Sequence, residues 1–284
     1  MKKIPTLVFG HRNPDTDSVC SAIAMSYLKN ELGDNTSPRV IGHINKESQF
    51  VLNYFGIKEP EYLNNVKVQL RNVHYNKGVK LKETASIKEV VDYIQEKHCT
   101  AVPIVDDKNH LVSLITLKEI AMLFIEQSRE HLNTNYDHIL HALNGRKILK
   151  FHEEFDGKMV AGSYKSETFI ESAQLNKDDI LIVGNRAKVI KHGINCKISL
   201  LVLTNNFDLP EDLLELAKQN HISVISSSMD TYNTCNAINL SNYVKTILIN
   251  RSPAVVQELD YLTDFVAEAT RLGFTNYPIL NKKN

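Results

Sequence analysis

One short run near the N-terminus combines residue types that can bind a metal ion. It reads Gly10-His11-Arg12-Asn13-Pro14-Asp15-Thr16-Asp17-Ser18. The imidazole of His11 and the carboxylates of Asp15 and Asp17 form a mixed nitrogen and oxygen donor set. Such a set suits manganese, iron, cobalt or zinc, whereas all-oxygen sets suit magnesium or calcium. Pro14 stiffens the turn and helps to set how His11 and Asp15 converge. The alternative is an Asx-rich turn in which Asp17 or Ser18 caps the next helix, which does not explain a histidine and two acids together.

The segments around this run predict the start of a parallel α/β sheet. Residues 4–10 read as a short buried strand, and Val19–Leu32 follows as a helix that ends at Gly33. Val40–Ile44 predicts a second strand, and Glu47–Phe55 predicts a second helix. Ligands of open parallel sheets bind at the carboxyl ends of the strands. This order of elements places the metal-binding run at such an end, and the predicted fold class is α/β.

The sequence of the run resembles the first motif of a known enzyme family. The pattern Gly-His-x-Asn-Pro-Asp-Thr-Asp-Ser-x-Cys-Ser-Ala-Ile-Ala resembles that of family II inorganic pyrophosphatases, which belong to the DHH phosphoesterase superfamily. The resemblance continues through Gly42–Glu47 and Leu52–Gly56. It implies that His11 and Asp15 ligate one metal of a two-metal centre and that Asp17 ligates the other. It also implies manganese or cobalt in that centre, magnesium with the substrate, and pyrophosphate as the substrate.

In such a centre, two divalent ions bridge the phosphate oxygens and activate a shared water for in-line attack. The family's later Asp-His-Asn and Asp-His-His motifs and its Ser-Arg-Lys-Lys run are not found in this sequence. Asp137-His138 is followed by Ile139, and we interpret that pair as a helix-surface pair. We therefore expect the chain to be truncated at its C-terminus and to be inactive by itself.

A helix–strand–turn–strand–helix block follows and is partly repeated at the end of the sequence. The first copy consists of Ile87–Lys97, Ala101–Val105, a turn, His110–Ile115 and Lys118–Glu126. The second copy consists of the helix Val255–Arg271 and the strand Tyr277–Leu280. A repeat whose second copy breaks off inside the unit also predicts an incomplete chain. Between the copies, strand-like and helix-like segments alternate, which predicts another small α/β domain.

The repeated block resembles CBS domains, and the region between the copies resembles a DRTGG domain. The first resemblance rests on Ala101–Asp106, Leu111–Ile115 and Asn276–Leu280. The second rests on Gly184-Asn185-Arg186, Thr204-Asn205-Asn206 and Ile225–Tyr232. Together they imply four parts: residues 1–65 as the N-terminal part of a DHH catalytic domain, 66–133 as a first CBS unit, 134–243 as a DRTGG domain and 244–284 as a partial second CBS unit.

Paired CBS units imply a binding site for adenine nucleotides in the cleft between the copies. In the family AMP and ADP inhibit, ATP can activate, and diadenosine polyphosphates span two copies of the dimer. Tyr277 matches an aromatic residue that stacks on adenine, although a tyrosine packed at a strand edge is the alternative. Thr275 and Thr100 occupy positions where many members carry a phosphate-binding arginine. Thr116 and Glu119 match a Ser/Thr-x-x-Asp pair that holds ribose and phosphate. A homodimer is expected because paired CBS modules commonly associate.

Composition narrows the class of protein. The 284 residues contain 33 Lys plus Arg and 33 Asp plus Glu, so no global field favours nucleic acid or an anionic membrane. The four cysteines form no C-x-x-C pair, which argues against a zinc knot or a disulfide framework. No stretch approaches the roughly 20 apolar residues of a membrane helix. We therefore expect a cytoplasmic protein with no nucleic-acid partner.

Two other functions are compatible with these patterns. A DHH-type phosphoesterase acting on nucleotides is less favoured, because the Asn-Pro-Asp-Thr-Asp-Ser context is specific to the pyrophosphatase motif. The other is a non-catalytic module that senses adenine nucleotides, in which the phosphoesterase start is vestigial. Nucleotide binding without hydrolysis distinguishes such a module from the enzyme.

Overall fold

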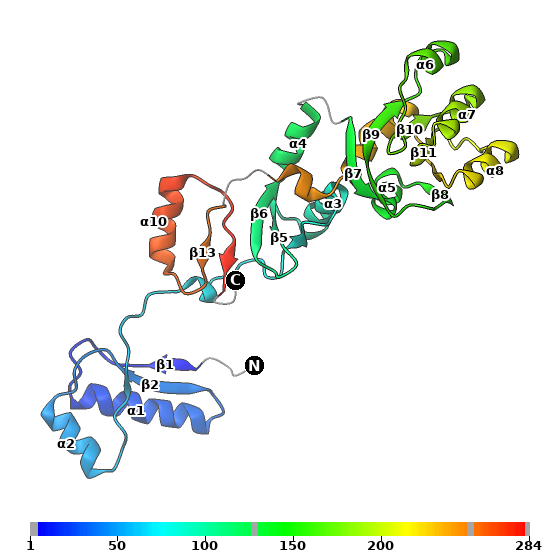
Figure 1. Ribbon diagram of the computed structural model, residues 1–284. Helices are drawn as coiled ribbons and strands as arrows, with labels where there is room; N and C mark the ends of the chain where they lie inside the picture. The colour runs from blue at the N-terminus through cyan, green and yellow to red at the C-terminus, as the bar shows by residue number, and fades with distance from the viewer. Residues whose placement is uncertain (1–4, 126–129, 249–252, 282–284) are drawn as a thin grey trace. The chain divides into compact units, whose positions relative to one another are not determined.

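The computed structural model describes residues 5–125, 130–248 and 253–281 (Figure 1). It divides into a small unit, formed by Met1–Val73 with Leu259–Glu268, and a large unit, formed by His74–Glu258 with Ala269–Asn284. No helix in the described ranges is both long enough and apolar enough to cross a lipid bilayer.

The small unit contains a three-stranded parallel sheet with the strand order β1-β2-β3. Its elements are β1 (Thr6–Val8), α1 (Thr16–Glu31), β2 (Thr36–Val40), α2 (Lys46–Tyr54) and β3 (Glu61–Tyr62). Its buried core consists of Val19 of α1, Val40 of β2, Leu52 of α2, and Ile44 from the segment just before α2. The parallel sheet expected at the start of the chain is therefore present.

The second strand was predicted four residues too late. The expected strand Val40–Ile44 overlaps the observed β2 at Val40 alone. The strand begins at Thr36 because a polar stretch containing Pro38 pairs with β1, with Pro38 opposite Val8. Proline lacks a backbone donor and is uncommon inside strands, so the sequence pattern pointed to the apolar residues that follow.

The first repeated block of the large unit forms a second three-stranded sheet, with the order β4-β5-β6. Its elements are β4 (Leu81–Lys82), α3 (Ile87–Lys97), β5 (Ala101–Val105), β6 (Leu111–Thr116) and α4 (Leu117–Ile125). A capping box in which Ser86 and Glu89 satisfy each other's backbone N–H starts α3. Ile87, Val90 and Ile94 then bury one face of that helix against β5 and β6.

The last block resembles the first more closely than the sequence pattern indicated. It contains β13 (Val256–Gln257), α10 (Leu262–Leu272) and β14 (Ile279–Leu280), and β13 pairs with β14 in parallel. Residues 255–261, which were expected to begin the helix, instead form β13 and a turn. The same strand–turn–helix order occurs at β4 and α3, so the repeat also includes the strand before the helix.

A six-stranded sheet with the order β7-β9-β10-β11-β12-β8 forms the centre of the large unit. Its strands are β7 (His131–Asn135), β8 (Arg146–Leu149), β9 (Glu154–Ala161), β10 (Ile180–Val183), β11 (Leu200–Leu203) and β12 (Ser223–Ser226). Neighbouring strands from β9 to β12 are parallel, whereas β7 and β8 pair antiparallel at the two edges. All four residues of β10, β11 and β12 are buried, as expected for parallel strands covered on both faces.

Five helices cover the two faces of this sheet (Figure 1). They are α5 (Tyr136–Leu143), α6 (Ser166–Ser172), α7 (Ala187–Asn195), α8 (Glu211–Gln219) and α9 (Thr231–Ile238). One core contains Phe169 of α6, Val189 of α7 and Leu213 of α8. The other core contains Ile139 of α5 and Ile238 of α9. The sheet and the helices on its two faces therefore form a three-layer α/β structure.

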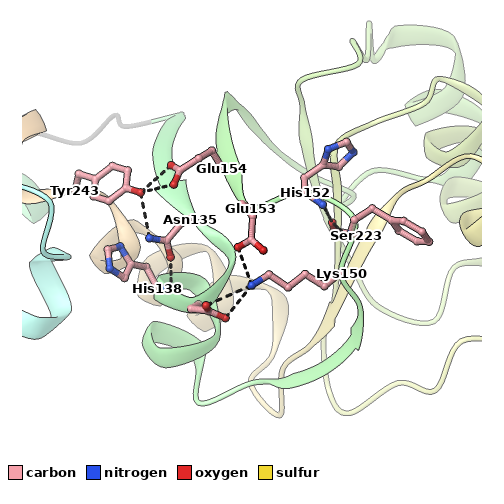
Figure 2. A network of polar contacts seen from close by, with 10 residues as sticks. Asn135, His138, Lys150, His152, Glu153, Glu154, Ser223 and Tyr243 are labelled. Carbon is pink, nitrogen blue, oxygen red and sulfur yellow. Dashed lines mark hydrogen bonds and ion pairs between the residues drawn. The ribbon is translucent and has the colours of Figure 1, made fainter.

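Polar contacts around Tyr243 join the end of β7 to the start of β9 (Figure 2). The hydroxyl of Tyr243 donates to the carboxylate of Glu154, whose oxygens lie 2.7 and 2.9 Å away, and accepts from Asn135 Nδ2 at 3.1 Å. The ring of His138 on α5 meets the ring of Tyr243 edge-on, with centroids 5.2 Å apart. His138 Nε2 lies 3.3 Å from Glu89 Oε2 on α3.

The interpretation of His138 as a surface residue is therefore wrong. Its side chain is 15% exposed, and its Nδ1 is buried with no hydrogen-bond partner among the described residues. Burial lowers the pKa of His138, against the opposing pull of Glu89 and Glu154. A neutral imidazole fits this position, because protonation would leave a buried Nδ1–H without an acceptor among the described residues.

Candidate functional sites

The loop from β1 to α1 carries the predicted metal ligands at the carboxyl end of the first strand. His11 Nε2 lies 3.4 Å from Asp15 Oδ1, and the two side chains are 61% and 60% exposed. Asp15 also caps α1, since Oδ1 accepts from Ser18 N at 2.9 Å. Asp17 is engaged separately and accepts from Ser21 Oγ at 3.2 Å. The structure thus brings His11 and Asp15 together and leaves Asp17 apart.

The loop brings together two of the three predicted metal ligands. No cluster of three or more His, Cys, Asp or Glu side chains is present among the residues that the structure describes. The hydroxyl of Ser18 is buried there without a hydrogen-bond partner. A side-chain carbon on Gly10 would come within 1.8 Å of that hydroxyl, so glycine is required for the loop to approach α1 this closely. One nitrogen donor, one oxygen donor and an unsatisfied hydroxyl fit a divalent transition metal better than they fit calcium.

A cavity of ≈ 610 Å³ lies in the large unit. Residues 75–80, residues 98–101 and residues 276–281 supply most of its wall. A cavity of this size suits a ligand as large as a nucleotide. Three segments that are far apart in the sequence therefore form one candidate binding site.

Two of the predicted nucleotide-binding residues line this cavity, and a third lies next to it. Thr100 and Tyr277 are both part of the wall. Thr100 Oγ1 donates to Asn276 Oδ1 at 2.8 Å, and Asn276 Nδ2 donates to Thr275 Oγ1 at 3.0 Å. These contacts hold the β5 side of the wall to the β14 side. The Tyr277 ring meets Phe274 edge-on, with centroids 6.3 Å apart.

The predicted ribose-binding pair, Thr116 and Glu119, is not part of the lining of this cavity. Glu119 Oε2 accepts from Thr116 N at 2.9 Å and also from the Thr116 hydroxyl. Burial opposes ionisation of Glu119, but these hydrogen bonds prevail and lower its pKa. In this structure the pair fixes the first turn of α4.

Sequence reasoning missed the charged residues of the cavity wall. Lys77 and Lys80 line it, with Glu258 as an acidic counterpart. They come from segments with no recognised motif, and only the fold brings them together. The signal available in the sequence was the pair of lysines around Gly78, in a segment without regular structure just before β4.

The motifs of the middle region meet at the carboxyl ends of β10, β11 and β12. Asn205 N donates to Met229 O and Asn206 N donates to Ser227 O, each at 2.8 Å. Arg186 Nη1 donates to Gly162 O at 2.6 Å. These groups are satisfied by one another, so their evident role is to fix the strand-end loops.

Models of two known domain families match two regions of the chain. The family model of the DRTGG domain matches residues 138–241, and that of the CBS domain matches residues 71–126. The chain contains a CBS domain and a DRTGG domain. The CBS match includes the β4-β5-β6 sheet, and the DRTGG match includes β8 to β12. The exact limits of the four predicted parts stay a prediction.

Similarity along nearly the whole of this chain points to one group of enzymes. The chain is 28% identical over 284 residues to a cobalt-dependent inorganic pyrophosphatase of Clostridium perfringens, covering 98% of this chain and 51% of that protein. It is 26% identical over 278 residues to a probable manganese-dependent inorganic pyrophosphatase of Thermotoga maritima, covering 95% and 49%. A probable manganese-dependent enzyme of Bacillus cereus is 42% identical over 99 residues, which are 33% of this chain and 31% of that enzyme. The chain spans about half the length of the first two relatives.

A solved structure supports the arrangement of the CBS and DRTGG domains. It contains these domains of the regulatory region of the Clostridium perfringens pyrophosphatase, complexed with its activator diadenosine tetraphosphate. The two structures agree with a TM-score of 0.68 at 25% identity, covering 77% of this chain and 96% of that one. The predicted α/β fold with CBS and DRTGG domains is therefore confirmed.

Proposed function

We propose that this chain is part of a metal-dependent inorganic pyrophosphatase whose activity is regulated by adenine nucleotides. The observation that carries the proposal is similarity along 98% of the chain to the cobalt-dependent enzyme, with His11 and Asp15 in contact at the end of a parallel strand. Pyrophosphate is the substrate in this proposal, and the protein acts in the cytoplasm as a homodimer.

In this proposal, adenine nucleotides bind in the cavity beside Tyr277. The ring of Tyr277 supplies a stacking surface for adenine, and base–aromatic stacking contributes about 1–3 kcal/mol. Thr100, Asn276 and Thr275 form a hydrogen-bonded series at the wall. Thr116 and Glu119 are assigned to ribose and phosphate by resemblance, and binding there requires Glu119 to release its contacts with Thr116. AMP, ADP, ATP and diadenosine polyphosphates are the expected ligands.

The loop after β1 holds the metal in this proposal. His11 supplies a nitrogen donor and Asp15 an oxygen donor to one manganese or cobalt ion, and Asp17 contributes to a second ion. Bound metals supply charge neutralisation of pyrophosphate and a more acidic water, with magnesium accompanying the substrate. The residues of this chain bring the donors to the edge of the sheet, where Pro14 is buried and Asp15 is fixed at the start of α1.

Two measurements test the proposal. A version of the protein extended to the length of its relatives should hydrolyse pyrophosphate with manganese or cobalt, and AMP should slow that hydrolysis. Calorimetric titration of the present chain should show AMP binding. The absence of hydrolysis in an extended, folded and metal-loaded protein would contradict the enzyme assignment.

A second candidate is a nucleotide-sensing module without catalysis. It is favoured by one observation: no cluster of three or more metal-binding side chains occurs within residues 5–125, 130–248 and 253–281. This candidate predicts that the present chain binds AMP and that the extended protein does not hydrolyse pyrophosphate. Activity of the extended protein toward a panel of nucleotides would instead favour a DHH phosphoesterase.

A further inference from the structure

The charges on the cavity wall are few and unbalanced. Lysine and glutamate side chains supply basic and acidic groups of the lining, at Lys77, Lys80 and Glu258. Two positive groups against one negative group favour an anionic ligand, although the whole chain has a net charge of +0. Thr100 and Thr275 occupy the two positions where a phosphate-binding arginine was expected. The positive charge of the wall therefore comes from residues other than those two, and its role has to be explained separately.

Lys77 and Lys80 are held by uncharged neighbours. Lys80 Nζ donates to Asn109 Oδ1 at 2.8 Å, and Lys77 Nζ lies 5.2 Å from the centroid of the Tyr75 ring. Both neighbours also line the cavity. Neither lysine forms an ion pair with a carboxylate in the described part of the chain, whereas nearby Lys82 pairs with Asp107 at 3.0 Å. The positive charge at the wall is therefore available to a ligand.

The backbone between the two lysines favours a clamp. Gly78 has φ 75°, a left-handed conformation that side-chain-bearing residues rarely adopt, and the chain turns there. Lys77 and Lys80 flank this turn, so both ammonium groups lie on the same segment of the wall. Lysine is a common point-charge partner of phosphate, and two such groups can engage more than one phosphate.

We propose that Lys77 and Lys80 form a phosphate clamp that makes the affinity of the cavity depend on the number of ligand phosphates. The proposal rests on the proposed nucleotide site and goes beyond it by assigning the phosphate contacts. The clamp replaces the arginine that this chain lacks at Thr100 and Thr275. Glu258 opposes it and reduces affinity for the most highly charged ligands.

The test is calorimetric titration of the full chain with adenosine, AMP and ATP at low and moderate salt. The wild-type protein should bind ATP more tightly than AMP and AMP more tightly than adenosine, with the strongest salt dependence for ATP. The double substitution Lys77→Gln and Lys80→Gln should weaken ATP binding by about tenfold or more and leave adenosine binding nearly unchanged. Glu258→Gln should change ATP affinity in the opposite direction.

Lys191→Gln is the control for loss of a lysine charge outside the site, because Lys191 is an exposed residue of α7 that does not line the cavity. It should bind all three ligands as the wild type does. Equal weakening of adenosine and ATP in the double variant, or ATP binding that does not respond to it, would overturn the clamp while leaving the nucleotide site standing. If the folded wild type binds none of the three ligands, the proposed nucleotide site fails as well.

Discussion

At the scale of single residues, Asp15 combines an observed helix cap with a proposed metal-binding role, and the two can be tested separately. Its carboxylate contacts His11 and also caps α1 through Ser18 N. A helix cap needs only a side-chain oxygen acceptor, whereas a transition-metal ion binds a charged carboxylate more tightly than a neutral amide. Substitutions of Asp15 should therefore affect the helix cap and metal binding differently.

We predict that Asp15→Asn keeps the helix cap and loses manganese binding, whereas Asp15→Ala loses both. The alanine variant should lower the stability of the small unit by about 1 kcal/mol, the usual effect of removing a cap, and the asparagine variant should change it little. Thermal unfolding and manganese titration of both variants measure the two effects. Full manganese affinity in the asparagine variant would rule out Asp15 as a ligand.

We also predict that Tyr277→Ala lowers AMP affinity by roughly tenfold, as expected from the loss of one stacking contact. Tyr277→Phe keeps the ring and should retain most of that affinity, because the face of the ring supplies the stacking surface. Isothermal titration of both variants with AMP provides the measurement. If the two variants bind AMP equally, the ring does not stack on the base.

At the scale of elements, apolar strands and amphipathic helices were predicted well. The sequence pattern located α3 and β5 at their observed limits, because their buried residues are apolar, at helical spacing in α3 and nearly continuous in β5. It did not identify β7, whose alternating burial is hidden by four polar residues in His131–Asn135. Long-range pairing with β9 stabilises that strand, and local sequence carries little information about such pairing.

The candidate sites, like the elements, were predictable where the residues are close in sequence and not where they meet only in the folded chain. A dense motif identified His11 and Asp15, and their contact follows from a tight local loop. Lys77 and Glu258 are far apart in sequence and meet only in the folded large unit. His138 was misjudged for the same reason, since its burial depends on α3 and on Tyr243.

The contact between α3 and α5 should make stability depend on pH. The pKa of His138 is below its ordinary value of 6.5 in the folded chain, so below about pH 6.5 the unfolded chain binds more protons than the folded one. The stabilising contribution is therefore present above that pH and is lost as pH falls through the folded pKa. His138→Gln should reduce the loss of stability between pH 7.5 and pH 5.

Urea unfolding at several pH values, monitored by circular dichroism, measures this dependence. His141→Gln is the control, because His141 lies on the same helix, pairs with Asp92 on α3 and is about half exposed. That variant should keep most of the pH dependence of the wild type. Parallel stability curves for His138→Gln and the wild type would show that the buried imidazole is not responsible.

At the scale of the whole molecule, the two proposed ligands bind to different compact units. The loop that carries the proposed metal ligands belongs to the small unit, and all lining residues of the cavity belong to the large unit. Each ligand stabilises the unit that binds it by mass action, by about 2.7 kcal/mol at a hundredfold excess over Kd.

We therefore predict separate protection patterns in hydrogen exchange. AMP should slow amide exchange in β5 and β14, which border the cavity, and manganese should slow exchange in the first turn of α1. Mass-spectrometric exchange with each ligand alone provides the measurement. Protection of β5 and β14 by manganese alone would indicate that the present chain already couples the two sites.

The two ends of the DRTGG region lie next to each other. Tyr243 N donates to Asn133 O at 3.0 Å, and Asn133 N donates to Asn242 Oδ1 at 2.7 Å, although Asn133 and Asn242 are 109 residues apart in sequence. A domain that enters and leaves its host through adjacent strands is easily gained or lost as a unit. We therefore expect that a protein engineer could replace this region with a fluorescent domain or a short hairpin to build a nucleotide reporter.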